Sequence, residues 1–247
     1  MPMLPAALLL ACLAALAWYT WRDVAEYAAF KQLTETADRQ RSYRRWTLKA
    51  FALFAGGSLV CLAAMGRLSA VLALPAEFAP LAAKARAAFP LGEIGPIVLG
   101  AVVGGMVGGA ALAAVMAQRG AGKASPLQVG DIDALMPRNG AESLWAAVIS
   151  LNAGVSEELF FRLTLPLLLA LLTGNLVVAF AVAAAVFGFV HIYQGWTGVL
   201  ATGFLGLALS ALYLASGSLI AAMAAHAILD LFGLVVRPTL VRMLRRR

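Results

Sequence analysis

The stretch that decides the fold is residues 155–192, which read VSEELFFRLTLPLLLALLTGNLVVAFAVAAAVFGFVHI. It holds two apolar runs, residues 155–173 and 176–192, separated only by Gly174 and Asn175. Each run approaches the roughly 20 apolar residues that a helix needs to cross a hydrocarbon core. The runs are continuous and rich in Leu and Ala, whereas a membrane β-strand alternates lipid-facing with lumen-facing residues. This stretch therefore predicts two consecutive membrane-spanning helices.

The composition of the whole chain extends this interpretation. Of 247 residues, 62% are hydrophobic and 13% are charged, which is more apolar surface than one water-soluble core needs. The excess must face lipid, so the chain is predicted to be all-α, a polytopic transmembrane helix bundle of about seven spans. The predicted spans are residues 4–19, 48–65, 94–116, 155–173, 176–192, 198–215 and 218–236.

The positive charge of the chain fits membrane topology better than nucleic-acid binding. The net charge is +7, but Lys and Arg cluster between Arg22 and Lys49 and again between Arg237 and Arg247. Positively charged loops stay on the cytoplasmic side, so both clusters are predicted to lie there, with the N-terminus outside. The expected partners of these charges are anionic membrane lipids, and no nucleic-acid partner is predicted.

The first span resembles a secretory signal, because residues 15–17 read ALA and the run is short. No basic residue precedes it, and the basic cluster that follows would resist translocation, so it is predicted to be retained as a helix. Cys12 and Cys61 both fall within spans, where a small apolar side chain suffices. Neither a disulfide nor a metal site is predicted from them.

Two segments predict how the helices pack or bend. Gly100, Gly104 and Gly108 have the four-residue spacing that lets membrane helices approach closely, so they are interpreted as packing residues. Residues 141–173 would make one straight helix about 50 Å long, too long for a single untilted span. A break is expected at residues 152–154, which read NAG, and Pro166 is a second candidate for a kink.

Residues 157–162, EELFFR, carry most of the charge inside the predicted spans. A charged side chain at membrane depth costs at least a few kcal/mol unless it is paired or hydrated, so it indicates function by default. Glu158 and Arg162 are four residues apart with the acid first, which favours an ion pair along the helix. Glu157 lies about 100° round the helix from Glu158 and has no such partner, so it is the candidate general base.

The two histidines of the chain, His191 and His226, also fall in predicted spans. His226 and Asp230 share a helix face at four-residue spacing. A single histidine in a span could simply hydrogen-bond a neighbouring helix, but two of them with several carboxylates indicate a common site. With the topology above, Glu157, His191 and Asp230 all fall in the cytoplasmic half of their spans. They are predicted to meet in an intramembrane cavity that opens to the cytoplasm.

Together these residues resemble the CPBP family, the CAAX prenyl proteases and bacteriocin-processing proteins, across residues 141–236. The family motifs are similar to EExxxR, FxxxH and HxxxN or HxxxD, and here they consist of the following residues: Glu157, Glu158 and Arg162; Phe187 and His191; His226 and Asp230. The resemblance implies a glutamate-dependent intramembrane endopeptidase. By it, Glu157 and His191 activate water, His226 and Asp230 assist, and Glu158, Arg162 and Phe187 give structural support.

Position 230 departs from the common pattern, because prenyl-protease members commonly have asparagine there. An ionised aspartate cannot donate to an oxyanion, so Asp230 must be protonated or must orient His226 instead. No cofactor is predicted, although Glu157, His191 and His226 could instead bind zinc. From another class, the same side chains could serve a non-catalytic membrane immunity protein or a transporter.

Three parts are predicted along the chain: N-terminal transmembrane helices and loops at residues 1–140, a catalytic bundle at residues 141–236 and a basic cytoplasmic tail at residues 237–247. The predicted substrate is a peptide or a lipidated protein near the membrane. The Ala-, Gly- and Arg-rich composition with short loops favours a bacterial inner membrane as the location.

Overall fold

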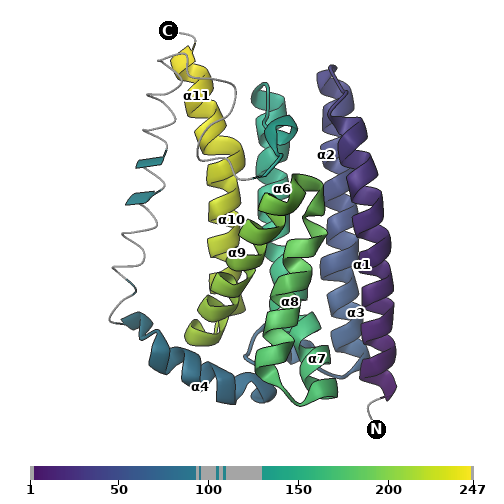
Figure 1. The fold of residues 1–247 in the computed structure, drawn as a ribbon, viewed down its shortest axis with the longest axis vertical. Coiled ribbons are helices and arrows are strands. Elements are labelled where there is room, and N and C mark those ends of the chain that lie inside the picture. Colours follow the sequence, from purple (N-terminus) through teal and green to yellow (C-terminus); the bar gives the residue numbers. More distant parts are fainter. Residues whose placement is uncertain (1–2, 93–94, 96–103, 106–107, 110–129, 246–247) are drawn as a thin grey trace.

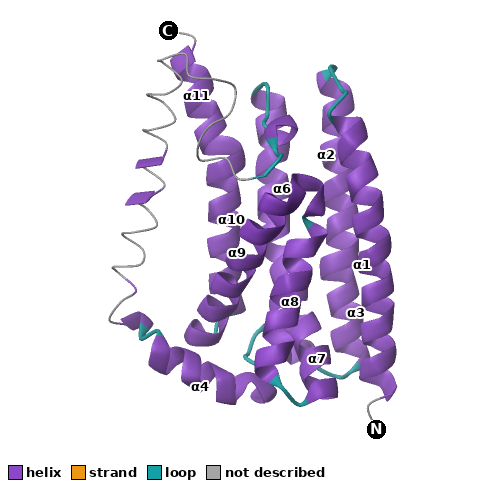
Figure 2. Ribbon diagram, viewed as in Figure 1, coloured by secondary structure: helices purple, strands orange, loops and turns teal. Residues whose placement is uncertain are grey.

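The protein folds as a bundle of helices, and no strand occurs among the residues that the structure describes (Figures 1 and 2). A computed structural model describes residues 3–92, 95, 104–105, 108–109 and 130–245. The prediction of an all-α polytopic membrane bundle is confirmed. Within the described part, four helical segments are long and apolar enough to cross a membrane: Met3–Phe30, Thr36–Ala64, Ile192–Ser216 and Leu219–Met243. A shorter apolar helix, Leu176–Val190, lies among them.

Two long antiparallel segments form one side of the bundle (Figure 1). The first is α1 (Met3–Phe30), and the second runs through α2 (Thr36–Ala50), the π-helical segment η1 (Phe51–Gly56) and α3 (Gly57–Ala64). No charged residue occurs from residue 3 to residue 21. At 1.5 Å per residue this uncharged part of α1 is about 27 Å long, close to the thickness of a hydrocarbon core.

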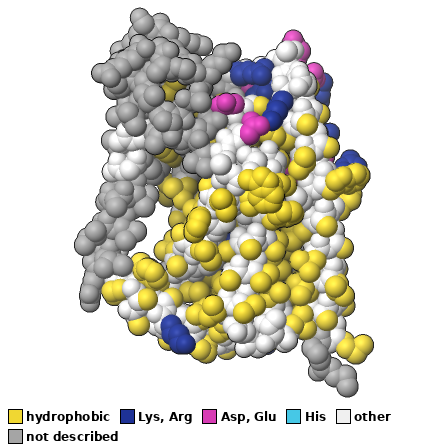
Figure 3. Space-filling model, viewed as in Figure 1, with side chains coloured by type: hydrophobic (Ala, Val, Ile, Leu, Met, Phe, Trp, Pro, Cys, Tyr) yellow, Lys and Arg dark blue, Asp and Glu magenta, His cyan; other side chains and the backbone are white. Residues whose placement is uncertain are grey.

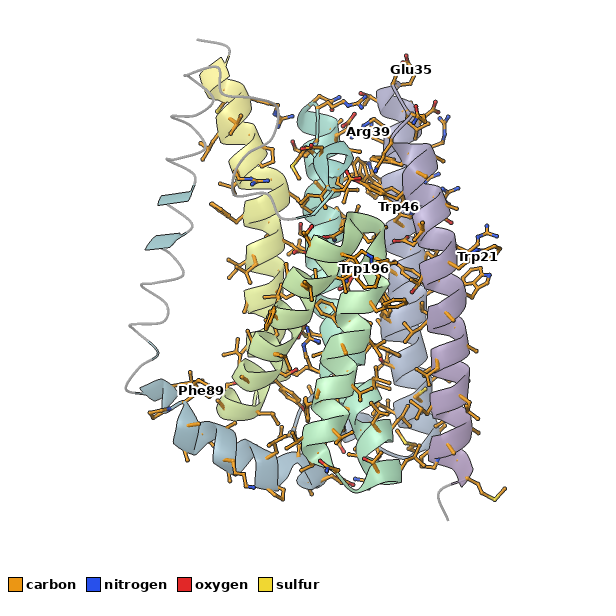
Figure 4. All side chains as sticks on the ribbon, viewed as in Figure 1. Trp21, Glu35, Arg39, Trp46, Phe89 and Trp196 are labelled. Atoms are coloured by element: carbon orange, nitrogen blue, oxygen red, sulfur yellow. The ribbon has the colours of Figure 1, made fainter. Side chains whose placement is uncertain are left out.

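Two exposed tryptophans lie at one level of the bundle. Trp21 and Trp196 are 74% and 69% exposed, and they lie at a similar height along the bundle (Figure 4). Tryptophan is enriched at membrane interfaces, so this level fits one boundary of a hydrocarbon region. On the face in Figure 3, most of the visible charged side chains lie at the upper end of the molecule, and the surface below them is largely hydrophobic.

At the opposite end the chain crosses the bundle in short helices. They are η2 (Leu68–Val71), η3 (Ala76–Phe78) and α4 (Ala79–Ala88), and α4 lies almost perpendicular to the bundle axis (Figure 1). Phe78 and Ala82 are fully buried and join the main hydrophobic core. The predicted span at residues 94–116, with its glycine spacing, lies largely outside the described residues.

The helix that carries the acidic motif is continuous, so the expected break at residues 152–154 is wrong. It runs through α6 (Gly140–Glu158), the π-helical segment η5 (Leu159–Thr164) and α7 (Leu165–Thr173). Gly154 serves packing instead, because a Cβ atom there would lie 2.7 Å from Ala227 Cβ and 2.8 Å from Met223 O. The irregular backbone falls in η5, directly before Pro166, which cannot donate the hydrogen bond that a regular helix needs.

The remaining helices complete the bundle around α6. They are α8 (Leu176–Val190), η6 (Ile192–Gln194), α9 (Gly195–Ser216), α10 (Leu219–Leu231), η7 (Phe232–Val236) and α11 (Arg237–Arg245). The turn between α8 and α9 lies lower in the bundle than the upper ends of α1, α2, α6 and α11 (Figure 1). The end of α8 therefore lies within the length of the taller helices.

Candidate active site

A cavity of about 260 Å³ lies beside the end of α8. Its walls come from α1, α2, α6, α8, η6, α9 and α10, and they include Glu157, His191, His226 and Asp230. Trp46 lines its upper part, above the level of the exposed Trp196 (Figure 4). The cavity thus reaches from the polar motif residues towards the charged end of the molecule, and the four predicted catalytic residues share it without any break in α6.

Glu157 and His191 face each other across this cavity. Glu157 Oε2 lies 4.0 Å from His191 Nε2. His191 Nδ1 lies 2.8 Å from the Phe187 carbonyl oxygen, which can only accept, so Nδ1 carries the proton and Nε2 presents a lone pair. Glu157 Oε2 is buried and has no hydrogen-bond partner within the described part of the chain. The two acceptors are therefore separated by a distance that one water molecule can bridge.

Glu158 connects an arginine on its own helix to a histidine on another. Glu158 Oε2 lies 3.0 Å from Arg162 Nε, so the pair that the four-residue spacing predicts is present. Glu158 Oε1 lies 2.8 Å from His226 Nδ1. The Glu158 and Arg162 side chains are fully buried and His226 is nearly so. The carboxylate accepts the Nδ1 proton, which directs His226 Nε2 towards the cavity.

Phe187 packs at the centre of these polar groups. The Arg162 guanidinium lies 4.4 Å from the centre of its ring. The rings of His191 and His226 approach it edge to face, at 4.9 and 5.9 Å between centroids. An aromatic face attracts a cation in a site without water, so Phe187 supports Arg162 and separates the two histidines.

Asp230 lies beside the exposed nitrogen of His226. Its Oδ2 atom is 3.6 Å from His226 Nε2, and its side chain is the most exposed of the motif residues, at 30%. The helix α10 supplies both residues from one face, as the spacing predicts. Asp230 therefore approaches the same nitrogen that would face a substrate.

The arrangement of these side chains bears on the zinc alternative. His226 directs Nδ1 at Glu158 and has Asp230 beside Nε2. Of the three candidate zinc ligands, this leaves Glu157 and the Nε2 atom of His191 open to the cavity. Among the described residues, no group of three or more His, Cys, Asp or Glu side chains is spaced to hold a metal ion. Cys12 and Cys61 are buried with their sulfur atoms 3.7 Å apart and form no disulfide.

Several cavity residues come from the N-terminal half, and one buried ion pair joins that half to α6; none of these residues belongs to a sequence motif. Asp23 lines the cavity from α1 and lies 3.3 Å from Lys49 Nζ. Arg39 and Glu142 form a fully buried ion pair at 3.1 Å. Because Arg39 and Glu142 are 103 residues apart, no local spacing could have identified them. The sequence gives only a weak indication of Asp23, as an acidic residue close to the end of the first apolar run.

The fold and the site together define an integral membrane protein with a polar cavity enclosed by apolar helices. Residues 139–232 match the family model described as type II CAAX prenyl endopeptidase Rce1-like. The match confirms, for this segment, the resemblance to the CAAX protease family that the motifs predict. It supports a CAAX-type endopeptidase in general terms. The chain has no significant match among the curated proteins or the solved structures.

Proposed function

We propose that the protein is an intramembrane endopeptidase in which Glu157 and His191 activate one water molecule. The observation that carries the proposal is the pair of acceptors 4.0 Å apart, Glu157 Oε2 and His191 Nε2. A water between them donates one proton to each, which directs its lone pair at a peptide carbonyl. Glu157 takes a proton as the water attacks and later delivers it to the leaving amine.

His226 stabilises the oxygen that becomes negative in the tetrahedral intermediate. Its Nδ1 proton is bonded to Glu158, and its protonated form presents a second N–H at Nε2. Asp230 lies 3.6 Å from this atom and favours the protonated ring. We therefore assign to Asp230 the role of orienting and charging His226, and we assign to it no hydrogen bond to substrate.

The proposed substrate is a peptide or a prenylated protein that approaches from the cytoplasmic side of the membrane. The cavity lies near the level of Trp21 and Trp196, which we take as the inner interface, and extends past Trp46 towards the charged end of the bundle. Aromatic and aliphatic side chains make up most of its wall, which suits an extended apolar segment next to the scissile bond. The Ala-, Gly- and Arg-rich composition favours a bacterial cytoplasmic membrane.

The test compares the native chain with Glu157→Gln in proteoliposomes and in cells. The change keeps the shape of the side chain and removes the base, so cleavage should fall by about 10²- to 10⁴-fold. Glu35→Gln is the control, because Glu35 is exposed at the charged end of the molecule (Figure 4). Peptides or proteins that accumulate in cells only with the variant would be the candidate substrates. Sequencing the ends of the fragments made by the native chain would then give the cleavage site. Unchanged cleavage by Glu157→Gln would show that Glu157 is not the base. No cleavage by either protein, with the activity in cells unaffected by Glu157→Gln, would instead support a transport, immunity or scaffold role.

We also propose that the reaction needs no metal ion, because His226 is engaged on both sides by carboxylates. Activity of the purified protein should persist after dialysis against a strong chelator. Loss of activity that zinc alone restores would replace this mechanism with the metal-dependent one.

A further inference from the structure

The aspartate at position 230 leaves the proposed site short of hydrogen-bond donors. Oxyanion stabilisation works through donors placed in advance, and an ionised carboxylate donates none. Asp230 also competes with substrate for His226 Nε2, from which it lies 3.6 Å away. A peptidase that works as proposed above therefore needs another donor in this cavity.

Most hydroxyl groups of the cavity are already committed to protein acceptors. The Tyr27 hydroxyl donates to the Asp131 carbonyl at 2.7 Å, and the Tyr43 hydroxyl donates to the Leu135 carbonyl at 3.1 Å. The two threonine hydroxyls donate within their own helices, Thr47 to the Tyr43 carbonyl and Thr202 to the Gly198 carbonyl. Within the described part of the chain, this leaves the hydroxyls of Tyr19 and Tyr193 without an acceptor.

Tyr193 is the better placed of these two. It lies in η6, two residues after His191, and the two rings are 6.0 Å apart. Gln194 Nε2 donates to the Tyr193 oxygen at 3.0 Å, so that oxygen already accepts one bond and its own proton remains to be donated. The accepted bond also polarises the hydroxyl and strengthens it as a donor.

The ring of Tyr193 is held in place by its neighbours. It packs edge to face on Tyr27 at 5.1 Å between centroids, and Tyr27 is itself fixed by its bond to Asp131. The Gln194 carbonyl accepts from the Asp131 backbone N–H at 2.7 Å, which ties this turn to the same segment. Tyr19 differs, because its ring packs under the Lys49 ammonium at 4.6 Å, and among the described residues it makes no ring contact with either histidine.

We propose that Tyr193 is a further catalytic residue, whose hydroxyl donates a hydrogen bond to the oxyanion of the tetrahedral intermediate. It supplies the donor that position 230 lacks in this chain, beside the Nε2–H of His226. The bond forms only as charge develops on the carbonyl oxygen, so it accelerates the reaction without tightening the binding of the peptide.

The test compares Tyr193→Phe with Tyr213→Phe in the full chain in detergent. Tyr213 is buried in the hydrophobic core and does not line the cavity, and its hydroxyl has no hydrogen-bond partner within the described part of the chain. For Tyr193→Phe we expect kcat to fall by about 10²-fold with KM nearly unchanged, the size of effect found for one oxyanion donor. Tyr213→Phe should keep kcat within a few-fold, after correction for any lower yield of folded protein.

A binding measurement separates a catalytic role from a structural one. A hydrated peptide trifluoromethyl ketone imitates the tetrahedral intermediate, and a reduced-amide peptide of the same sequence imitates the bound substrate. Tyr193→Phe should lower the binding affinity for the ketone by about 10- to 100-fold and leave the affinity for the reduced amide unchanged. Equal weakening of both ligands, or a selective loss in Tyr19→Phe instead, would overturn the assignment. If Glu157→Gln is inactive while Tyr193→Phe has normal kcat, this inference fails and the proposed function stands.

Discussion

Two buried arginine–glutamate pairs in this protein have the same geometry and different surroundings. Arg162 and Glu158 lie 3.0 Å apart at membrane depth, and Arg39 and Glu142 lie 3.1 Å apart at the charged end of the bundle. All four side chains are fully buried. The distances alone would suggest that the two pairs have the same role, but their hydrogen bonds differ.

The pair at the charged end is nearly saturated with partners. Glu142 accepts from Thr36, from Arg39 and from the Arg138 backbone N–H, and Arg39 also donates to the Ala134 carbonyl. These bonds fix residues 130–139, a loop segment that contributes Ile132 and Leu135 to the cavity wall. Only Arg39 Nη1 in this pair lacks a partner among the described residues, and removal of either charged side chain would leave the other buried without its counterion.

The hydrogen bonding of the pair at membrane depth, Glu158 and Arg162, is less complete. Three nitrogen atoms of Arg162 and Glu158 Oε2 have no well-aligned hydrogen-bond partner among the described residues. The remaining oxygen of Glu158 is used for His226. In the pair of Glu158 and Arg162, one carboxylate oxygen orients the His226 imidazole while several other polar atoms lack well-aligned hydrogen bonds. Such incompletely bonded buried groups are typical of a functional site.

The largest expected effect is on peptide cleavage, which should depend on the pair of Glu158 and Arg162 and not on the pair of Glu142 and Arg39. Glu158→Gln should lower cleavage per folded molecule by about 10²- to 10⁴-fold, because His226 loses the carboxylate that fixes its tautomer. It should also cost about 3–5 kcal/mol of unfolding free energy, since Arg162 is left unpaired. Peptide cleavage and unfolding by SDS titration measure the two effects.

The matched variant Glu142→Gln should lose stability but keep the cleavage rate of each folded molecule. If Glu142→Gln lost specific activity as strongly as Glu158→Gln, the distinction between the two pairs would be wrong.

The second prediction concerns stability alone. Arg39→Met should cost about 3–5 kcal/mol, because it leaves the Glu142 carboxylate buried without its cation. The double variant Arg39→Met/Glu142→Met should recover much of this loss, since two apolar side chains can replace a buried ion pair at little cost. A double-mutant cycle from SDS titration measures the coupling. Additive losses in the cycle would mean that the two side chains do not act as a pair.

These two pairs also explain how far the sequence could predict the molecule. Long apolar runs fix the helices, because the physics of lipid acts on each span separately. The pair of Glu158 and Arg162 follows from helix geometry, and so does the shared face of His226 and Asp230. The segment from Glu157 to Asp230 was recognisable because each motif lies within one helix or at its end.

Contacts between distant segments could not be predicted in the same way. Nothing local relates Arg39 to Glu142, or Glu158 to His226, because each partner is chosen by how helices pack. Gly154 was misinterpreted as a break because glycine is equally suited to a bend and to a close helix contact. Only the position of α10 against α6 distinguishes these uses, and that position depends on the whole bundle.

The third prediction tests the close contact of α6 and α10 that brings the two halves of the site together. Gly154→Ala would place a Cβ atom 2.7 Å from Ala227 Cβ, so the helices must separate. Overpacking of this kind costs about 1–3 kcal/mol, and it should also lower activity because Glu157 follows three residues later. Gly57→Ala is the control, since a Cβ atom there meets nothing within 4 Å. Equal stability of the two variants would show that α6 and α10 can adjust at no cost.

The smallest expected effect is a pH dependence confined to the pair outside the hydrocarbon region. Burial by itself would raise the pKa of Glu142, but the Arg138 backbone N–H and the Arg39 guanidinium hold that pKa below its ordinary value. A carboxyl group with a lowered pKa stabilises the fold above its unfolded pKa, which is about 4.3, and this stabilisation is lost as pH falls further. Unfolding free energy measured by SDS titration should therefore decrease below about pH 4.3. Glu142→Gln should show a smaller decrease over the same interval, because its amide does not titrate, and identical slopes for the two proteins would assign the acid sensitivity to other carboxyl groups.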